Sequence, residues 1–94
     1  MLIIAGYLDV AAEERDAYVA SCREVVAAAR RAPGCLDFAI TPDSLDARRV
    51  RVYERWETEA ELLAFRGSGP SVEQQSEVLD ADVRRFRIDS IGPA

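Results

Sequence analysis

Residues 50–62 read VRVYERWETEAEL, and this stretch decides the fold. Every second residue from Val50 to Trp56 lies on the same side of an extended chain, and the alternation of side chains is typical of a β-strand. Thr58 and Glu61 follow with the spacing of a capping box, in which two side chains satisfy the first free N–H groups of a helix. The stretch therefore predicts a strand that is followed at once by a helix.

Another strand precedes this one. Residues 36–41 alternate between apolar and polar side chains, and the Pro-Asp-Ser sequence at 42–44 ends the alternation. Two alternating segments joined by a short polar loop predict an antiparallel hairpin made of residues 36–41 and 50–56.

The N-terminal third of the chain predicts a strand and a long helix. Residues 2–9 are rich in strand formers and apolar on both faces, which indicates a strand that is covered on both sides. Residues 11–32 repeat apolar side chains every three or four positions and are followed by Pro33 and Gly34. This pattern is typical of an amphipathic helix with a defined end.

The C-terminal part of the chain is more polar. Residues 83–91 predict a last strand, and its alternating arginines indicate one face that is solvated or ion-paired across an interface. Before it, the glycine-rich residues 67–71 predict a mobile lid or hinge. Residues 72–79 predict a short helical turn.

These elements follow one another in the order β-α-β-β-α-β. With right-handed crossovers this order predicts one domain, residues 1–94, of ferredoxin-like α+β fold, with a four-stranded antiparallel sheet and both helices on one face. The other face has no cover within the chain, although the strand at 2–9 is apolar on both sides. We therefore expect a homodimer in which a second copy covers that face, with Tyr7 and Tyr53 directed towards it.

The residue inventory excludes several kinds of catalytic site. The chain contains no histidine, lysine or asparagine. A histidine general base, a Ser-His-Asp triad, a lysine Schiff base and histidine-ligated zinc or haem are therefore excluded. Cys22 and Cys35 are expected to be reduced and to pack as small apolar side chains.

Charge and hydropathy also limit the partners. The net charge is −5 and all twelve basic residues are scattered arginines, which argues against a nucleic-acid-binding surface. No apolar run approaches the roughly 20 residues of a membrane span, and no basic-then-apolar leader precedes the first strand. We expect a cytoplasmic protein that does not bind a membrane.

Four stretches of the chain resemble the antibiotic biosynthesis monooxygenase family, namely residues 52–62, 4–8, 14–18 and 32–35. The resemblance implies a dimeric α+β barrel, in which the sheets of two subunits pack face to face and each subunit holds a pocket between its sheet and helices. It also implies a monooxygenase that oxidises a phenolic, anthrone-like or quinol aromatic substrate. Molecular oxygen would be the co-substrate, and neither a cofactor nor a metal is expected.

Two residues of strand 50–56 match the family's catalytic pattern. Trp56 corresponds to a strand-end tryptophan, whose indole could stack on a flat ring and direct its N–H towards a developing oxyanion. The alternative is a tryptophan of the hydrophobic core. Glu54 shares its face with apolar neighbours, so burial would raise its pKa and suit it to removing a phenolic proton. The alternative is a carboxylate that pairs with an arginine or caps a neighbouring segment.

Four further residues are candidates for substrate binding. Val52 and Phe65 occupy positions where family members carry asparagine and histidine. Tyr18 can close the pocket with its ring and supply a hydroxyl donor. Arg66 can reach across the pocket mouth to an anionic substrate or intermediate, although an exposed charge at a helix end is the alternative.

The chain also departs from the family pattern in ways that leave other functions open. The asparagine of haem-degrading members falls near Gly6, and a histidine falls at Pro70 or Ser71. A cofactor-free oxygenase is the first hypothesis, because its chemistry needs mainly binding, desolvation and orientation of the substrate. The alternatives are a non-catalytic binding module for a hydrophobic aromatic metabolite, and a polyketide cyclase or isomerase on the same scaffold.

Overall fold

The computed structural model describes residues 1–67 and 77–94. Its elements, in chain order, are β1 (Leu2–Asp9), the 3-10 turn η1 (Ala12–Glu14), α1 (Arg15–Ser21), α2 (Arg23–Arg31), β2 (Cys35–Pro42), β3 (Arg49–Trp56), α3 (Glu59–Arg66) and β4 (Asp80–Arg87). The predicted strands and helices are all present in this order.

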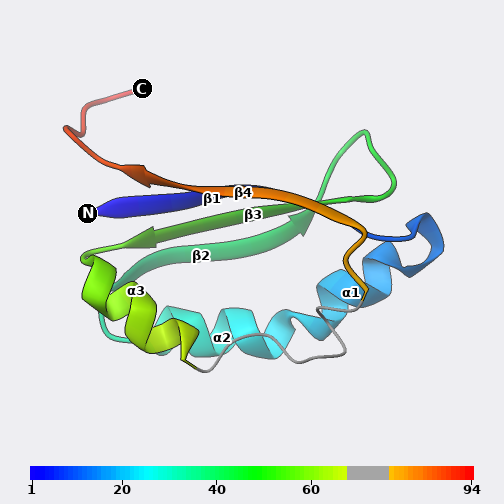
Figure 1. The fold of residues 1–94 in the computed structure, drawn as a ribbon, viewed down its shortest axis with the longest axis horizontal. Coiled ribbons are helices and arrows are strands. Elements are labelled where there is room, and N and C mark those ends of the chain that lie inside the picture. The colour runs from blue at the N-terminus through cyan, green and yellow to red at the C-terminus, as the bar shows by residue number, and fades with distance from the viewer. Residues whose placement is uncertain (68–76) are drawn as a thin grey trace.

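The four strands form one antiparallel sheet in the order β2-β3-β1-β4. The described helices lie together on one side of it, with α1 and α2 running beneath the strands and α3 beneath one end (Figure 1). This arrangement confirms the predicted α+β, ferredoxin-like fold with the helices on one face.

The register of the strands fixes which side chains face the helices. Gly6 of β1 lies opposite Val52 of β3 and Val83 of β4, and Ile4 lies opposite Glu54. Because residues directly opposite each other share a face of the sheet, all of these residues belong to the helix-facing side.

The hydrophobic core between sheet and helices is divided into two clusters of buried side chains. The first lies where α3 and α2 pack and contains Leu2, Ile4, Ala29, Phe38, Trp56 and Leu62. The second lies where α1 packs and contains Val10, Tyr18, Cys22 and Val50. The clusters occupy opposite ends of the sheet, because Val50 and Trp56 are the second and the last residue of the same strand.

The first helix differs from the prediction. The sequence predicted one helix over 11–32, whereas the structure divides it into η1, α1 and α2, with Cys22 between α1 and α2. The hydroxyl of Ser21 donates a hydrogen bond to the carbonyl oxygen of Tyr18 at 2.6 Å. Side-chain bonds of this kind compete with the helical ladder and bend helices. The bend turns the α1 side chains onto the second core cluster.

The last strand also differs from the prediction. It spans 80–87 instead of 83–91, because pairing with β1 begins where Asp80 meets Asp9. Its arginines do not need an interface to find partners on the helix-facing side, since both Arg85 and Arg87 pair with Glu59 of α3 in the same chain. Both side chains are exposed, so the prediction of a solvated face agrees with the structure, and the ion pairs described here lie within the chain.

The helix α3 begins as the capping box predicts. The backbone N–H of Glu61 donates to the Thr58 hydroxyl at 3.2 Å, and that hydroxyl contacts the Glu61 carboxylate at 2.9 Å. The predicted lid at 67–71 lies outside the described residues except for Gly67, which follows the end of α3. Of the predicted turn at 72–79, only residues 77–79 are described.

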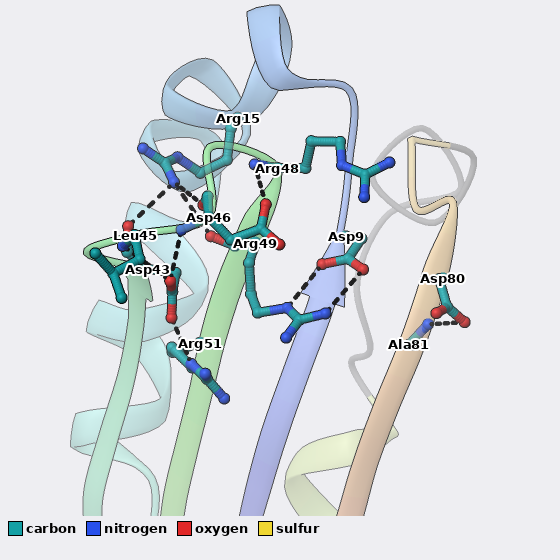
Figure 2. A network of polar contacts seen from close by, with 10 residues as sticks. All are labelled: Asp9, Arg15, Asp43, Leu45, Asp46, Arg48, Arg49, Arg51, Asp80 and Ala81. Carbon is teal, nitrogen blue, oxygen red and sulfur yellow. Dashed lines mark hydrogen bonds and ion pairs between the residues drawn. The ribbon is translucent and has the colours of Figure 1, made fainter.

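A polar network secures the hairpin loop that joins β2 to β3 (Figure 2). The carboxylate of Asp43 accepts hydrogen bonds from the backbone N–H groups of Leu45 and Asp46 and from the side chain of Arg51. Arg15 of α1 donates to the carbonyl oxygen of Asp46 at 2.9 Å and so ties the loop to the helix layer. The network fixes the start of β3, which carries three of the six candidate site residues.

Candidate functional site

A cavity of about 410 Å³ lies between the sheet and the helices. Its apolar wall consists of side chains from all four strands and from α2 and α3: Leu8, Val25, Ala28, Phe38, Ile40, Val52, Phe65 and Val83. Its polar side chains are Tyr18, Cys22, Glu24, Glu54 and Arg66. Such a volume falls in the lower part of the range of about 300–1,000 Å³ that small-molecule sites occupy.

The structure brings five of the six predicted site residues to this cavity. Glu54, Tyr18, Val52, Phe65 and Arg66 all line it, although they come from α1, β3 and α3. Trp56 does not line the cavity. The fold therefore gathers Glu54 and the four predicted substrate-binding residues around one cavity and places the tryptophan behind its wall.

Trp56 is completely buried, with no exposed surface. Its ring packs against Phe65 at 5.4 Å between centroids, and Phe65 in turn meets Phe38 edge-on at 5.8 Å. The indole N–H donates a hydrogen bond to Oε1 of Glu54 at 3.0 Å. The indole thus contacts a wall residue and the carboxyl group of the cavity, and its N–H is directed at Glu54.

Glu54 is the carboxyl group at the Trp56 end of the cavity. Burial raises its pKa above the ordinary value, because the apolar surroundings disfavour the charged form. The hydrogen bond from Trp56 and the positive charge of Arg66 oppose this effect and lower the pKa. Glu54 is therefore a carboxyl group that titrates closer to neutral pH than an exposed one and has a cation nearby.

Tyr18 and Cys22 form the opposite end of the cavity. Burial, the neighbouring thiol and the charge of Glu77 raise the pKa of Tyr18 to about 12. Burial also raises the pKa of the Cys22 thiol. Both groups are consequently neutral at pH 7, and each can take part in hydrogen bonds without carrying charge.

Sequence reasoning did not single out several of the lining residues. Phe38 and Ile40 share the parity of Val52 across the hairpin, so the alternation of their strand could have placed them on this wall. Cys22 and Val25 belong to the predicted apolar face of the helix. No pattern in the sequence distinguishes Glu24, an exposed residue at the start of α2.

The described residues hold neither a metal-ligand cluster nor a membrane-spanning helix. Within 1–67 and 77–94, no group of three or more histidine, cysteine, aspartate or glutamate side chains is arranged to hold a metal ion. None of the helices in these ranges combines the length and the apolar character needed to cross a bilayer.

Several solved structures share the fold of this chain. A structure from Deinococcus radiodurans is 16% identical, covers 100% of this chain with 98% of its own, and superposes with a TM-score of 0.86. A structure from Nitrosomonas europaea is 17% identical, covers 96% of this chain with 100% of its own, and superposes with a TM-score of 0.83. A structure from Chloroflexus aurantiacus is 21% identical, covers 97% of this chain with 96% of its own, and superposes with a TM-score of 0.73.

All three are named as candidate antibiotic biosynthesis monooxygenases. At these identities the likeness shows a shared fold. No curated protein matches the chain in sequence. The family model for antibiotic biosynthesis monooxygenases, however, matches residues 1–84. The chain therefore belongs to the antibiotic biosynthesis monooxygenase family.

Proposed function

We propose that this protein is a cofactor-independent monooxygenase that oxidises a phenolic, anthrone-like or quinol aromatic substrate with molecular oxygen. The observation that carries the proposal is Glu54, a carboxyl group with a raised pKa in the wall of a mainly apolar cavity. A general base works best when its pKa lies near the working pH, because it is then both ionised and basic enough to accept a proton. Apolar side chains of the cavity lie beside that base, among them Val52 and Phe38.

The reaction begins with proton transfer from the substrate hydroxyl to the Glu54 carboxylate. The resulting phenolate lies in apolar surroundings near the Arg66 guanidinium, which stabilises its negative charge. The anion transfers one electron to oxygen, and the two radicals combine to form a carbon–oxygen bond and, after protonation, a hydroperoxide. Cleavage of the O–O bond with loss of the hydrogen on that carbon leaves a carbonyl group and releases water.

Trp56 serves this reaction through Glu54. Its N–H holds one carboxylate oxygen at 3.0 Å, and its ring is shut off from the cavity by its neighbours. A fixed hydrogen bond orients the carboxylate and prevents it from turning into the core. We therefore assign Trp56 a positioning role in place of the direct contact with substrate that the sequence suggested.

An oxygen electrode tests the proposal with anthrone and with 1,4-dihydroxynaphthalene, each corrected for the rate without protein. The wild-type protein should consume oxygen, and Glu54→Gln should reduce the rate by at least about 100-fold, the usual contribution of a general base. Glu57→Gln is the matched control, because Glu57 is exposed and does not line the cavity.

The same substrates distinguish the two alternatives. Conversion of substrate under anaerobic conditions would indicate a cyclase or isomerase. Binding without conversion in air would indicate a non-catalytic binding module. Either result, or an unchanged rate in Glu54→Gln, contradicts the oxygenase proposal.

We also propose that the protein acts as a homodimer. The sheet face away from the helices carries Ile3, Ala5 and Tyr7 of β1 next to Tyr53 of β3, and none of the described helices covers it (Figure 1). On this face Nε of Arg55 is shut off from solvent but has no hydrogen-bond partner among the described residues. An apolar centre and a buried unpaired donor both favour a covering partner.

A further inference from the structure

Glu54 lies at one end of the cavity, and Tyr18 and Cys22 lie at the other. Glu54 lies between Ile4 and Phe38, both members of the first core cluster, while Tyr18 and Cys22 belong to the second. Tyr18 packs in the same cluster as Val50, four residues before Glu54 on β3. At about 3.3 Å per strand residue, the two ends are therefore some 13 Å apart along the sheet.

The wall between the two ends is apolar. It is formed on the sheet by Ile40, Val52 and Val83, and on α2 by Val25 and Ala28. None of these side chains can accept or donate a hydrogen bond. A polar substituent in the middle of a bound ligand would lose its bonds to water and gain none from these side chains, so the wall selects against such ligands.

The Tyr18 end can satisfy one oxygen atom of a ligand. The hydroxyl of Tyr18 exchanges a hydrogen bond with the Cys22 thiol. A phenol has one O–H donor and free acceptor lone pairs, so Tyr18 can keep donating to the thiol and still accept a hydrogen bond from a ligand hydroxyl. At this end the ligand meets a neutral hydroxyl, whereas at the other end it meets a carboxylate.

We propose that the cavity selects an elongated aromatic ligand with one oxygen substituent at each end, a hydroxyl group at Glu54 and a second oxygen at Tyr18. The ligand lies along β3, with fused rings between the apolar side chains of the sheet and α2. The inference rests on the proposed function, because it uses the same cavity and base. It adds the position of the second oxygen and makes Tyr18 a specificity-determining residue.

Three naphthalene derivatives test this inference by calorimetric titration under anaerobic conditions. 2,6-Dihydroxynaphthalene carries its oxygens at opposite ends, 2,3-dihydroxynaphthalene carries both at the same end, and 2-naphthol has one. The 2,6 isomer should bind about tenfold more tightly than the 2,3 isomer, the usual gain from one satisfied hydrogen bond. The comparison needs no variant, and the two isomers have the same composition.

The variant Tyr18→Phe then tests whether Tyr18 is the residue that binds the second oxygen of the ligand. The substitution keeps the ring and its packing, and it should reduce the affinity for 2,6-dihydroxynaphthalene to that for 2-naphthol. Binding of 2-naphthol itself should not change. Thermal unfolding of the variant, followed by circular dichroism, verifies that it is folded.

The possible outcomes separate this inference from the proposed function. Equal binding of the two isomers, a preference that survives in Tyr18→Phe, or no measurable binding of any of the three compounds overturns it. An isomer preference without oxygen uptake supports the two-ended ligand and contradicts the oxygenase. Oxygen uptake without an isomer preference supports the oxygenase and contradicts the two-ended ligand.

Discussion

Glu54 is a polar residue on an apolar face, and its neighbours determine its chemistry. Ile4 and Phe38 flank it on the adjacent strands, and burial among such residues raises its pKa. Trp56 and Arg66 limit the rise, the first by a hydrogen bond and the second by its charge. Burial therefore favours the neutral carboxyl group, whereas Trp56 and Arg66 favour the carboxylate.

A titration of Glu54 tests this balance. Its carboxyl carbon, followed by nuclear magnetic resonance, should titrate above the ordinary value of 4.5. Trp56→Phe removes the N–H that favours the carboxylate, so the pKa should rise further in that variant. A Glu54 that titrates at or below the ordinary value, or that does not respond to Trp56→Phe, would contradict the proposed environment.

The raised pKa of Glu54 also makes the stability of the protein depend on pH. Since the folded state raises the pKa of Glu54, its contribution to stability is present at low pH and is lost as the pH rises through the folded-state pKa. In urea unfolding, the wild-type protein should lose stability as the pH rises above the ordinary Glu54 value of 4.5, and Glu54→Gln, which does not titrate at this position, should lack this loss.

The pKa of Asp43 is shifted in the opposite direction, below its ordinary value. Backbone N–H groups of Asp46 and Leu45 and the guanidinium of Arg51 lower its pKa from 3.8 to about 2. The stability that this carboxylate contributes is present above its unfolded-state pKa and is lost as the pH falls through the folded-state value.

Asp43→Ala should therefore be less stable than the wild-type protein at neutral pH, and the difference should shrink between about pH 4 and pH 2. Urea unfolding at a series of pH values measures it. Asp89→Ala is a suitable control, because Asp89 is exposed and makes no hydrogen bond to another described residue. A stability difference for Asp43→Ala that is the same at every pH would be inconsistent with this role.

At the scale of the elements, the contact between β1 and β4 depends on Gly6. Its φ of +154° is one that side chains rarely permit, and a Cβ there would lie 2.0 Å from the carbonyl oxygen of Asp82 and 2.7 Å from Cα of Val83. These are backbone atoms, so they cannot yield by a change of rotamer. The close approach holds Val83 of β4 against the cavity.

Gly6→Ala should consequently destabilise the protein by about 1–3 kcal/mol, as overpacking of a core does. Urea unfolding provides the measurement. Gly92→Ala is the matched control, since a Cβ at Gly92 would meet nothing within 4 Å. If the two variants are equally stable, β1 and β4 do not approach each other as described.

At the scale of the whole molecule, the face opposite the helices is the surface on which we propose that a second copy packs. It is hollowed near the C-terminus by a groove of about 510 Å³ lined by Ile3, Arg55, Phe86 and residues 87–92. Phe86 is 52% exposed in the single chain. A stable interface buries about 800 Å² on each partner, which a second copy of the sheet can provide.

Light scattering coupled to gel filtration should show a dimer. Ala5→Arg places a charge at the centre of the open face, beside Arg84 on the neighbouring strand, and should produce a monomer. Ala60→Arg on the exposed surface of α3 should remain dimeric. A wild-type protein that elutes as a monomer would remove the support for the homodimer.

The sequence by itself determined the order of the elements and the face on which each strand residue lies. Alternation from Val50 to Trp56 and the capping box at Thr58 act over a few residues, so they can be recognised without knowing what packs against them. For this reason β3, the start of α3 and the ferredoxin-like topology agree with the predictions.

The packing of the helices onto the sheet determines which residues of the helix-facing side border the cavity and which are buried in the core. Trp56 and Glu54 share one parity, yet the first is buried under Phe65 and the second lines the cavity. The difference arises because α3 covers one position and leaves space beside the other. The bend at Cys22 and the pairing of Arg85 with Glu59 likewise depend on distant packing, which short-range patterns do not encode.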